Sequence, residues 1–415
     1  MTEEQEQALR LATEAGHILL ENGAEISRVE ETMERIASAY GVEDESFFVL
    51  SNGIITTGQH YARAEFIPIK GTQLSKVVEV NQLSRDVSAP DGMTVDELRG
   101  RVAAIRASKG KPWWENTVGV AFGVSSFSVL FGGSAVDAAA TFVCGLPLGA
   151  FIAFAAPRLS RIMGNLLGGL LGGLLCIAAV AAGFGEHLPN MIIGTIIALV
   201  PGVPFTNGMR DLANEDYIAG ATRLVDATMV FLCIAMGVAL SFIVEGALSG
   251  GIMRLGKPVV DAFMSGWLVQ IAAAFVGTVG FSALFGAPRR YYAECGLTGA
   301  LGWAVYLAAG HAGTAAGAAF LAALAVAAAS QLLAKWRRCP VTVFLICGII
   351  PLVPGGGIFW TAYYLVSDQL RLAATMGFAA LKATIAIAGG IIVVGAVAAR
   401  LKRSRAKHKQ SQASL

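Results

Sequence analysis

Charged side chains are scarce in this sequence. Asp, Glu, Lys and Arg together make up 14% of its 415 residues, whereas hydrophobic residues make up 55%. An ordinary soluble protein carries far more charge on its surface, so this class is excluded. The net charge of +2 gives no basis for binding nucleic acid. The composition predicts a polytopic α-helical membrane protein that lies in the lipid bilayer.

Motifs for catalysis and for cofactor binding are also absent. The six cysteines stand singly in apolar segments without a Cys-x-x-Cys pair, which argues against a disulfide framework or a zinc site. A Gly-x-x-x-x-Gly-Lys-Ser/Thr loop is missing, so ATP-driven transport by this chain alone is disfavoured. Neither His-Glu-x-x-His nor Gly-x-Ser-x-Gly occurs. We therefore expect no enzyme activity, no cofactor and no metal site.

Acidic residues gather at the front of the chain. Residues 1–112 contain 18 of the 29 Asp and Glu residues but 12 of the 31 Lys and Arg residues. The first twenty residues include four glutamates and no long apolar core, so a cleaved signal peptide is not expected. This stretch is predicted to be a separate soluble domain in the cytoplasm.

The pattern inside this front domain is mixed. Apolar residues recur at helical spacing over 4–20, 24–40, 74–87 and 95–107. Stretches 46–58 and 64–69 are rich in β-forming residues, and Asn52-Gly53 indicates a hairpin. The sequence therefore predicts a small α+β domain. Its polar run 25–31 is typical of a solvated helix face or, alternatively, of a docking or gating surface.

Ten apolar runs follow, each about long enough for a helix to cross the hydrocarbon layer. They lie at about 117–136, 138–156, 163–184, 190–208, 227–248, 262–286, 293–310, 312–333, 341–360 and 377–399. Five runs fall in residues 113–250 and five in 251–400, on either side of the polar link Ser249–Pro258. The basic tail, residues 401–415, is typical of a cytoplasmic membrane anchor.

Positive charges indicate the orientation of these spans. With the front domain inside the cell, the inner segments hold most of the Lys and Arg residues and the outer loops hold few. Such an excess marks the cytoplasmic side of short loops. The pattern fits ten spans in the cell membrane with both termini in the cytoplasm. One span more or fewer would place the basic tail outside.

The two modules resemble each other. Residues 127–133 match 281–287 at five of seven positions, and Cys144-Gly145-Leu146, Leu199-Val200-Pro201-Gly202 and Ala227-Thr228 recur at 295–297, 352–355 and 383–384. Four matches in the same order, at offsets between 151 and 156 residues, indicate a duplication. Because each module has five spans, consecutive copies enter the membrane from opposite sides. The sequence therefore predicts an inverted 5+5 repeat.

The proline-glycine pairs fall near the middle of spans four and nine. Proline removes a backbone donor, so the carbonyls of Ile197 and Ile350 should lose their normal helical partners. Within hydrocarbon, a broken helix persists where it is buried in protein or lines a wet cavity. Matched breaks in two halves are typical of a transporter's binding site. We expect the repeat axis to bring the two breaks face to face.

Residues around the breaks are the candidate substrate ligands. A small zwitterion needs acceptors for its ammonium group and donors for its carboxylate, and a broken helix offers free carbonyls and free amides. The predicted substrate-binding residues are Pro201, Gly202, Pro204, Thr206, Asn207, Pro354, Gly355, Gly356, Gly357, Trp360, Thr361 and Tyr364. The alternative is that the breaks are plain kinks and that the aromatic residues form an interfacial belt.

Ionisable residues in or near the spans are candidates for coupling transport to protons. Asp211 and Asp226 are the preferred carboxylates, with Arg210 and Lys382 as the nearby cations. A carboxylate that changes protonation between two states of the protein can couple a proton to the substrate. The alternative is that these aspartates pair with Arg210 or Arg223 in an inner loop.

The run Glu21–Met33, the Ser51-Asn52-Gly53 turn and the two Leu-Val-Pro-Gly breaks resemble the threonine/serine exporter family, and the likeness covers nearly the whole chain. In that family, an acidic soluble front and five spans are followed by a second five-span module. The resemblance implies export of small hydroxy amino acids, driven by the proton gradient. Its related two-subunit members are associated with dicarboxylate export.

Two alternatives stay open at this stage. The first is the same fold exporting a small dicarboxylate such as succinate, for which a fixed cation such as Arg210 or Lys382 would face the site. The second is a membrane enzyme or receptor whose activity lies in the front domain. The fused two-module arrangement favours threonine and serine as substrates. The sequence gives no indication of the oligomeric state.

Overall fold

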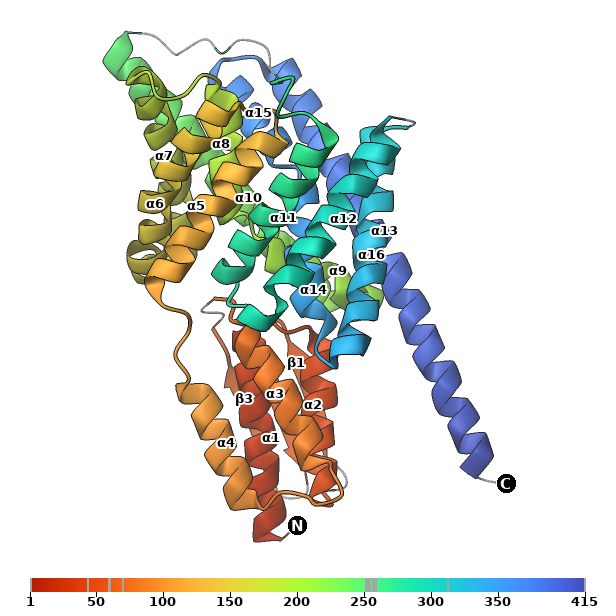
Figure 1. Cartoon of the computed structure of the whole chain (residues 1–415). Coiled ribbons are helices and arrows are strands. Elements are labelled where there is room, and N and C mark those ends of the chain that lie inside the picture. Colours follow the sequence, from red (N-terminus) through yellow and green to blue (C-terminus); the bar gives the residue numbers. More distant parts are fainter. Residues whose placement is uncertain are drawn as a thin grey trace.

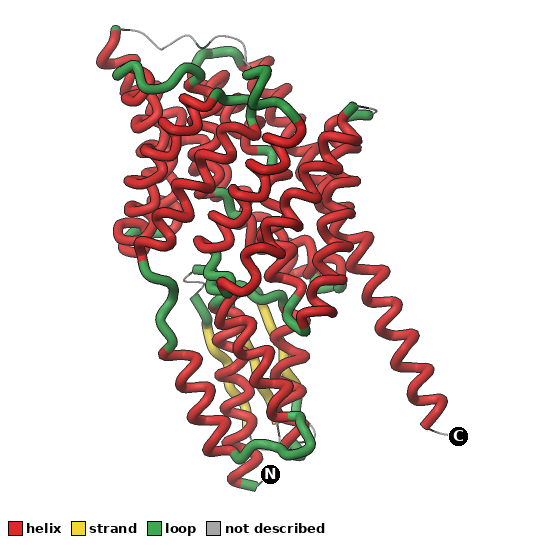
Figure 2. Tube along the Cα trace, viewed as in Figure 1, coloured by secondary structure: helices red, strands yellow, loops and turns green. Residues whose placement is uncertain are grey.

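A computed structural model describes residues 2–42, 45–58, 61–68, 71–250, 255, 260–311 and 313–413, with side chains up to residue 401. Most of the expected link Ser249–Pro258 lies outside these residues. Figure 1 shows a helical bundle with a smaller mixed unit at one end, and Figure 2 shows that the strands are confined to this unit. Both ends of the chain lie at the end of the molecule that carries the smaller unit.

The smaller unit, here called the N-terminal unit, combines four helices with a three-stranded antiparallel sheet in the order β1-β2-β3. Its elements are α1 (Glu3–Glu21), α2 (Ile26–Ala39), β1 (Ser46–Leu50), β2 (Gly53–Gly58), β3 (Tyr61–Phe66), α3 (Leu74–Val87) and α4 (Val95–Ala107). The four expected helices are present. The expected hairpin joins β1 to β2, with Leu50 paired to Gly53, and the sheet has a third strand.

Local signals explain where these helices begin. Thr2 and Thr94 each accept a hydrogen bond from the amide three residues on, and their own amides donate to the side-chain oxygens of Gln5 and Glu97, so both helices start with a capping box. The apolar faces of α1, α2, α3 and α4 meet in one core with side chains from the sheet. Ala219, at the start of α10, belongs to this core, so the unit is packed against the bundle.

The bundle contains the remaining helices, and two of its passes are interrupted. The helices are α5 (Trp113–Leu130), α6 (Ala135–Ala150, extended by irregular turns to Arg158), α7 (Arg161–Ala181), α8 (Leu188–Ile196), α9 (Gly202–Ala213), α10 (Tyr217–Ser249), α11 (Trp267–Leu284), α12 (Tyr292–Gly310), α13 (Ala315–Arg337), α14 (Val341–Ile349), α15 (Gly355–Val366) and α16 (Leu370–Ala413). The apolar run 377–399 and much of the basic tail form one helix, α16.

Six helices of the described part of the chain are long and apolar enough to cross a membrane, and there are eight spans if each bent pair counts as one. The bent pairs are α8 with α9, at 60°, and α14 with α15, at 46°. The chain is therefore a polytopic helical membrane protein. Helices α5 and α12 are not among these spans, so the count of ten stays a prediction.

Two backbone hydrogen bonds fix the relative direction of helices α5 and α11. Leu74 of the N-terminal unit donates to the carbonyl of Phe285, directly after α11, over 3.0 Å. At the other end of α11, the amide of Asp261 donates to the carbonyl of Gly132, just beyond the end of α5, over 3.0 Å. Helix α5 starts beside the N-terminal unit and α11 ends beside it, so these two packed helices run in opposite directions.

Helices α5 and α11 meet through a reciprocal contact. A Cβ atom on Gly123 of α5 would lie 2.6 Å from the ring of Phe281, and one on Gly277 of α11 would lie 2.9 Å from the ring of Phe127. Positions 123 and 277, like 127 and 281, are 154 residues apart. The two phenylalanine rings stand 5.2 Å apart. A contact in which each residue meets its partner's equivalent is the mark of a two-fold axis.

This contact makes a testable prediction about paired substitutions. Gly123→Ala and Gly277→Ala each place a methyl group against a ring, so we expect each to destabilise the protein by about 1 to 3 kcal/mol. Phe281→Leu should offset Gly123→Ala, and Phe127→Leu should offset Gly277→Ala. Thermal unfolding of the four single and four double variants measures the coupling. Equal coupling in the crossed pairs, Gly123 with Phe127 and Gly277 with Phe281, would contradict the contact.

Candidate functional site

The two Leu-Val-Pro-Gly breaks have the same backbone. Pro201 lies at φ −77° and ψ 60°, and Pro354 at φ −77° and ψ 56°. The amide of Gly202 donates to the carbonyl of Val200, and that of Gly355 to the carbonyl of Val353, both over 2.8 Å. These angles and bonds define an inverse γ-turn centred on proline. Each break is therefore a tight, internally bonded turn between two half-helices.

The carbonyls before the breaks are bonded rather than free. The carbonyl of Ile197 accepts from the amide of Val200 over 3.2 Å, and that of Ile350 accepts from Val353 over 3.1 Å. Proline removes the normal helical donor, as expected, but a turn of 3₁₀ helix supplies a closer one. The expectation that these two carbonyls are available to a substrate is therefore corrected.

The amides after the second break are better placed to bind a solute. The first amides of a helix have no acceptor within it. Ile358 donates to the carbonyl of Pro354, but the amides of Gly356 and Gly357 make none of the hydrogen bonds found in the described part of the chain. The positive end of the α15 helix dipole lies at these two amides.

The two breaks face each other across a small cavity of about 10 Å³. Its lining is Val200, Gly202, Phe205 and Phe231 from the first module, and Val353, Pro354, Thr384 and Ile387 from the second. Such a volume holds about one water molecule. The breaks come together as expected, and the space between them is nearly closed in this conformation.

Two glycines at the breaks have different surroundings. A Cβ atom on Gly202 would meet nothing within 4 Å, so this residue borders the cavity. A Cβ atom on Gly355 would lie 2.5 Å from the Ile197 side chain, so the second break needs glycine to approach the first. Pro201 precedes Gly202 as the N-cap of α9, and Gly357 packs against Ala380 of α16.

The remaining candidates on α15 lie beyond the cavity. The rings of Trp360 and Tyr364 are stacked with their centroids 5.4 Å apart, and the Thr361 hydroxyl donates to the carbonyl of Gly357 over 2.7 Å. None of these three residues lines the small cavity. On α9, Pro204 is partly buried and Thr206 is fully buried, and the Thr206 hydroxyl has no partner among the described residues.

The second half of α9 binds the N-terminal unit. The Asn207 side-chain amide donates to the carbonyl of Gly23 over 2.6 Å, and Asp211 accepts from the amide of Ile26 over 3.1 Å. From α10, Arg223 donates to the carbonyl of Ala24 over 3.0 Å. All three side chains are buried. The loop between α1 and α2 is thus fixed to the broken helix.

Glu25, within this loop, connects the unit to both modules. Its carboxylate pairs with Arg210 of α9, accepts from the Thr342 hydroxyl of α14 over 2.6 Å and accepts from Arg28 over 3.1 Å. Burial alone would raise the pKa of Glu25, but Arg210, Arg28 and the Thr342 hydroxyl outweigh it and lower the pKa to about 2. Glu25 therefore stays ionised at every physiological pH.

The candidate coupling residues are mostly paired. Asp211 forms an ion pair with Arg223 at 2.8 Å, Arg210 pairs with Glu25, and Asp226 pairs with Arg161. Lys382 is exposed on α16 and makes no ion pair within the described residues. The pairing alternative for Asp211 matches the structure, whereas Asp226 pairs with a different arginine than expected. A role for these residues in coupling stays a prediction.

We refer to the contacts of the α1–α2 loop with α9, α10 and α14 as the junction. A larger polar cavity of about 210 Å³ lies beside it. Helices α14 and α16 supply much of its apolar lining, and the polar side chains around it are those of Glu25, Ser27, Arg28, Glu31, Arg210, Asn214 and Gln331. The cavity offers both acceptors and donors. Glu25 and Thr342 belong to this junction but are not among the candidate site residues predicted from the sequence. For Glu25, the signal is its polar run 25–31, for which a docking or gating surface is one of the two interpretations.

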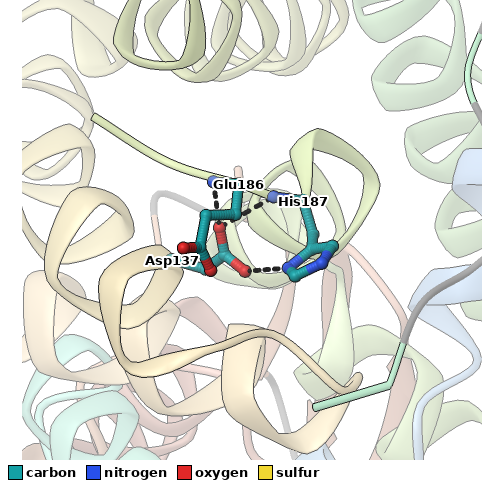
Figure 3. Close-up of side chains that lie close together, drawn as sticks. All are labelled: Asp137, Glu186 and His187. Atoms are coloured by element: carbon teal, nitrogen blue, oxygen red, sulfur yellow. Dashed lines mark hydrogen bonds and ion pairs between the residues drawn. The ribbon is translucent and has the colours of Figure 1, made fainter. Parts of the chain in front are cut away.

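At the other end of the bundle, Asp137, Glu186 and His187 converge (Figure 3). One Asp137 oxygen accepts from the amides of Glu186 and His187, over 2.7 and 2.9 Å. The other accepts from the Ser134 amide over 2.8 Å and contacts the His187 Nδ1 over 2.7 Å. Each carboxylate oxygen of Asp137 thus already has two polar contacts within the protein. The cluster therefore caps α6 and fixes the loop before α8.

Comparison with known proteins connects this architecture to a family. A family model described as "Putative threonine/serine exporter" matches residues 10–244, and a second, "Threonine/Serine exporter, ThrE", matches residues 270–397. The chain belongs to the threonine/serine exporter family. The two matches correspond to the first module with its N-terminal unit and to the second module, so this is the two-module form.

Individual relatives agree with this assignment. The chain is 26% identical to a "Threonine/serine exporter" of Corynebacterium glutamicum, covering 95% of this chain and 83% of the relative. It is 22% identical to a "Probable threonine/serine exporter" of Mycobacterium tuberculosis, covering 93% and 75%. A "Probable succinate transporter subunit YjjP" of Escherichia coli is 24% identical over 59% of this chain and 97% of that subunit. No solved structure matches.

The junction predicts a pH-dependent stability. Glu30, on α2, accepts from the amide of Val49 over 3.3 Å. Burial, together with the charges of Asp216, Glu34 and Asp211, raises the pKa of Glu30 from 4.5 to about 7. The folded protein thus binds this proton more tightly than the unfolded chain. Its stability should fall as the pH rises between these two values and then level off.

Glu30→Gln removes this penalty. We expect its thermal unfolding midpoint to exceed that of the wild type at about pH 8 and to equal it near about pH 4. Asp91→Asn, at an exposed turn, is the matched control and should shift neither end of the profile. Parallel profiles of wild type and Glu30→Gln over this range would show that Glu30 does not titrate as described.

Proposed function

We propose that this protein is a secondary exporter of threonine and serine that binds its substrate between the two broken helices and is driven by the proton gradient. The observation that carries the proposal is the cavity shared by the two proline-glycine breaks. Membership of an exporter family supports the direction of transport, and the names of the relatives, two of them threonine/serine exporters, support the substrate class.

The proposal includes an inverted 5+5 repeat of ten spans. Its support is the matching geometry at Pro201 and Pro354, the reciprocal contact of α5 with α11, and the opposite direction of those two helices. The packing also follows the repeat, because α8 contacts α15 while α14 contacts α9, and α10 contacts α15 while α16 contacts α9. A two-fold axis in the membrane plane exchanges the members of each pair.

In this scheme the substrate carboxylate binds the free amides of Gly356 and Gly357, and Thr384 accompanies it from α16. Gly202 leaves room on the opposite side. The substrate needs more space than the present 10 Å³, so the half-helices must separate to admit it. Asn207 and Asp211 bind α9 to the N-terminal unit, so the unit must move with α9 or these bonds must break. In this way the unit acts as a gate.

The proposed boundaries follow from the same scheme. Residues 1–112 form the cytoplasmic α+β domain, 113–250 and 251–400 form the two modules, and 401–415 form the basic tail. Both termini lie in the cytoplasm of a cell-membrane protein. The polar cavity beside Glu25 and Arg210 then faces the cytoplasm and receives substrate before export.

The charges near the breaks favour an amino acid over a dicarboxylate. Among the described residues, no charged side chain lines the cavity between the breaks. Arg210 is neutralised by Glu25, and Lys382 is exposed on α16, so neither is positioned as a fixed cation for a dianion. The succinate transporter relative keeps the dicarboxylate as the second candidate.

Efflux from proteoliposomes tests the function. We expect labelled threonine and serine to leave the vesicles, faster when an opposing pH gradient is applied, and labelled succinate to leave no faster than from empty vesicles. Lys382→Gln, at an exposed position of α16, should leave threonine efflux unchanged, because an amino acid needs no fixed cation there. Efflux of succinate alone, or threonine efflux unaffected by the pH gradient, would contradict the respective part of the proposal.

Gly202→Leu tests the site. Its Cβ atom enters open space, but the whole side chain is larger than the present cavity of about 10 Å³, so we expect a folded protein with a lowered unfolding midpoint. The same side chain occupies the space between the breaks, so threonine efflux should fall by about ten-fold or more. Gly100→Leu, at an exposed glycine of α4 that also has nothing within 4 Å, is the control for the substitution itself. Wild-type efflux by Gly202→Leu would place the substrate path elsewhere.

A further inference from the structure

A second large cavity, of about 370 Å³, lies between the N-terminal unit and the bundle. Helix α2 contributes Arg28, Glu31 and Arg35 to its lining, α3 contributes Arg85, and α13 contributes Lys335. Four of these five side chains are cations. We refer to this cavity, defined by those five residues, as the seam pocket.

Two of its cations form no ion pair with any residue that the structure describes. Arg28 is bonded to Glu25 over 3.1 Å, and Arg35 to Glu31 over 3.1 Å. Arg85 and Lys335 form no ion pair and no hydrogen bond among the described residues. They come from different parts of the fold, one from the N-terminal unit and one from the bundle. Their proximity leaves a concentration of positive charge that an anion can neutralise.

The position of the pocket suggests where such an anion comes from. Lys335 lies in the last turn of α13, one of the helices that can cross a membrane. The adjacent Trp336 is 69% exposed and is stacked under the guanidinium of Arg337. Exposed tryptophan and basic residues at the end of a span are typical of the membrane-water interface. Basic pockets there bind lipid head groups.

We propose that the seam pocket binds a phosphate group, and that Arg85 and Lys335 are its principal ligands. A free phosphate dianion neutralises both cations and the phosphodiester of a lipid head group neutralises one, and the oxygens of either suit the planar arginine donors as well as a lysine ammonium. The group is either the head of an anionic phospholipid or a free phosphate from the cytoplasm. In both cases it bridges the N-terminal unit to α13 and strengthens their contact.

Thermal unfolding of the full chain in neutral detergent tests this site. The wild type is titrated with inorganic phosphate, with micelles containing phosphatidylglycerol, and with potassium chloride and phosphatidylcholine as the respective blanks. We expect one phosphate ligand to raise the unfolding midpoint. Lys335→Gln and Arg85→Gln should each need about ten-fold more of that ligand for the same rise in the unfolding midpoint, because each removes a charge-assisted bond. Both side chains are exposed, so the variants should fold.

Lys109→Gln is the matched control, because it removes the same charge from an exposed position outside the pocket. It should respond to the ligand as the wild type does. Protection by phosphatidylglycerol alone identifies a lipid head group, and protection by inorganic phosphate identifies a soluble source. The proposal is overturned if neither exceeds its blank, if succinate protects while phosphate does not, or if Lys109→Gln weakens binding as much as Lys335→Gln.

Discussion

The structure depends on how two interrupted helices satisfy their backbones away from water. An unpaired backbone group in hydrocarbon costs several kcal/mol, so a break there is stable only if the protein surrounds it. Here each break bonds to itself through a γ-turn at Pro201 or Pro354, and the two modules bury both turns against each other. Among the described residues, the amides of Gly356 and Gly357 at the start of α15 make no hydrogen bond, and they follow directly on Pro354, which lines the cavity between the breaks.

The second constraint is the attachment of the N-terminal unit. The loop between α1 and α2 offers its backbone and Glu25 to buried side chains of α9, α10 and α14. A buried charge of this kind is strongly destabilising when its partner is lost. The loop and the broken helix therefore move together or separate at a considerable cost, which connects the soluble part of the chain to the breaks in the bundle.

Much of the fold follows from local sequence signals, but the junction does not. Proline-glycine pairs within apolar runs identified the breaks, and helical spacing identified α1 to α4, because each depends on nearby residues. Asn207, Arg210 and Asp211 bind residues of the loop between α1 and α2, far earlier in the chain. For Asp211 and Ile26 the separation is 185 residues. No local pattern encodes such a pair. The partner of Asp211 in its ion pair, Arg223, is close along the chain and is one of the alternatives that the sequence indicates, and a coupling role for Asp211 stays a prediction.

The central claim is that a solute binds where the two breaks meet. The most direct measurement is a structure of the full chain in lipid with threonine bound. The account predicts density between Val200 and Val353, with the substrate carboxylate at the amides of Gly356 and Gly357 and with the half-helices further apart. Density confined to the cavity beside Glu25 and Arg210, with the breaks still in contact, would contradict it.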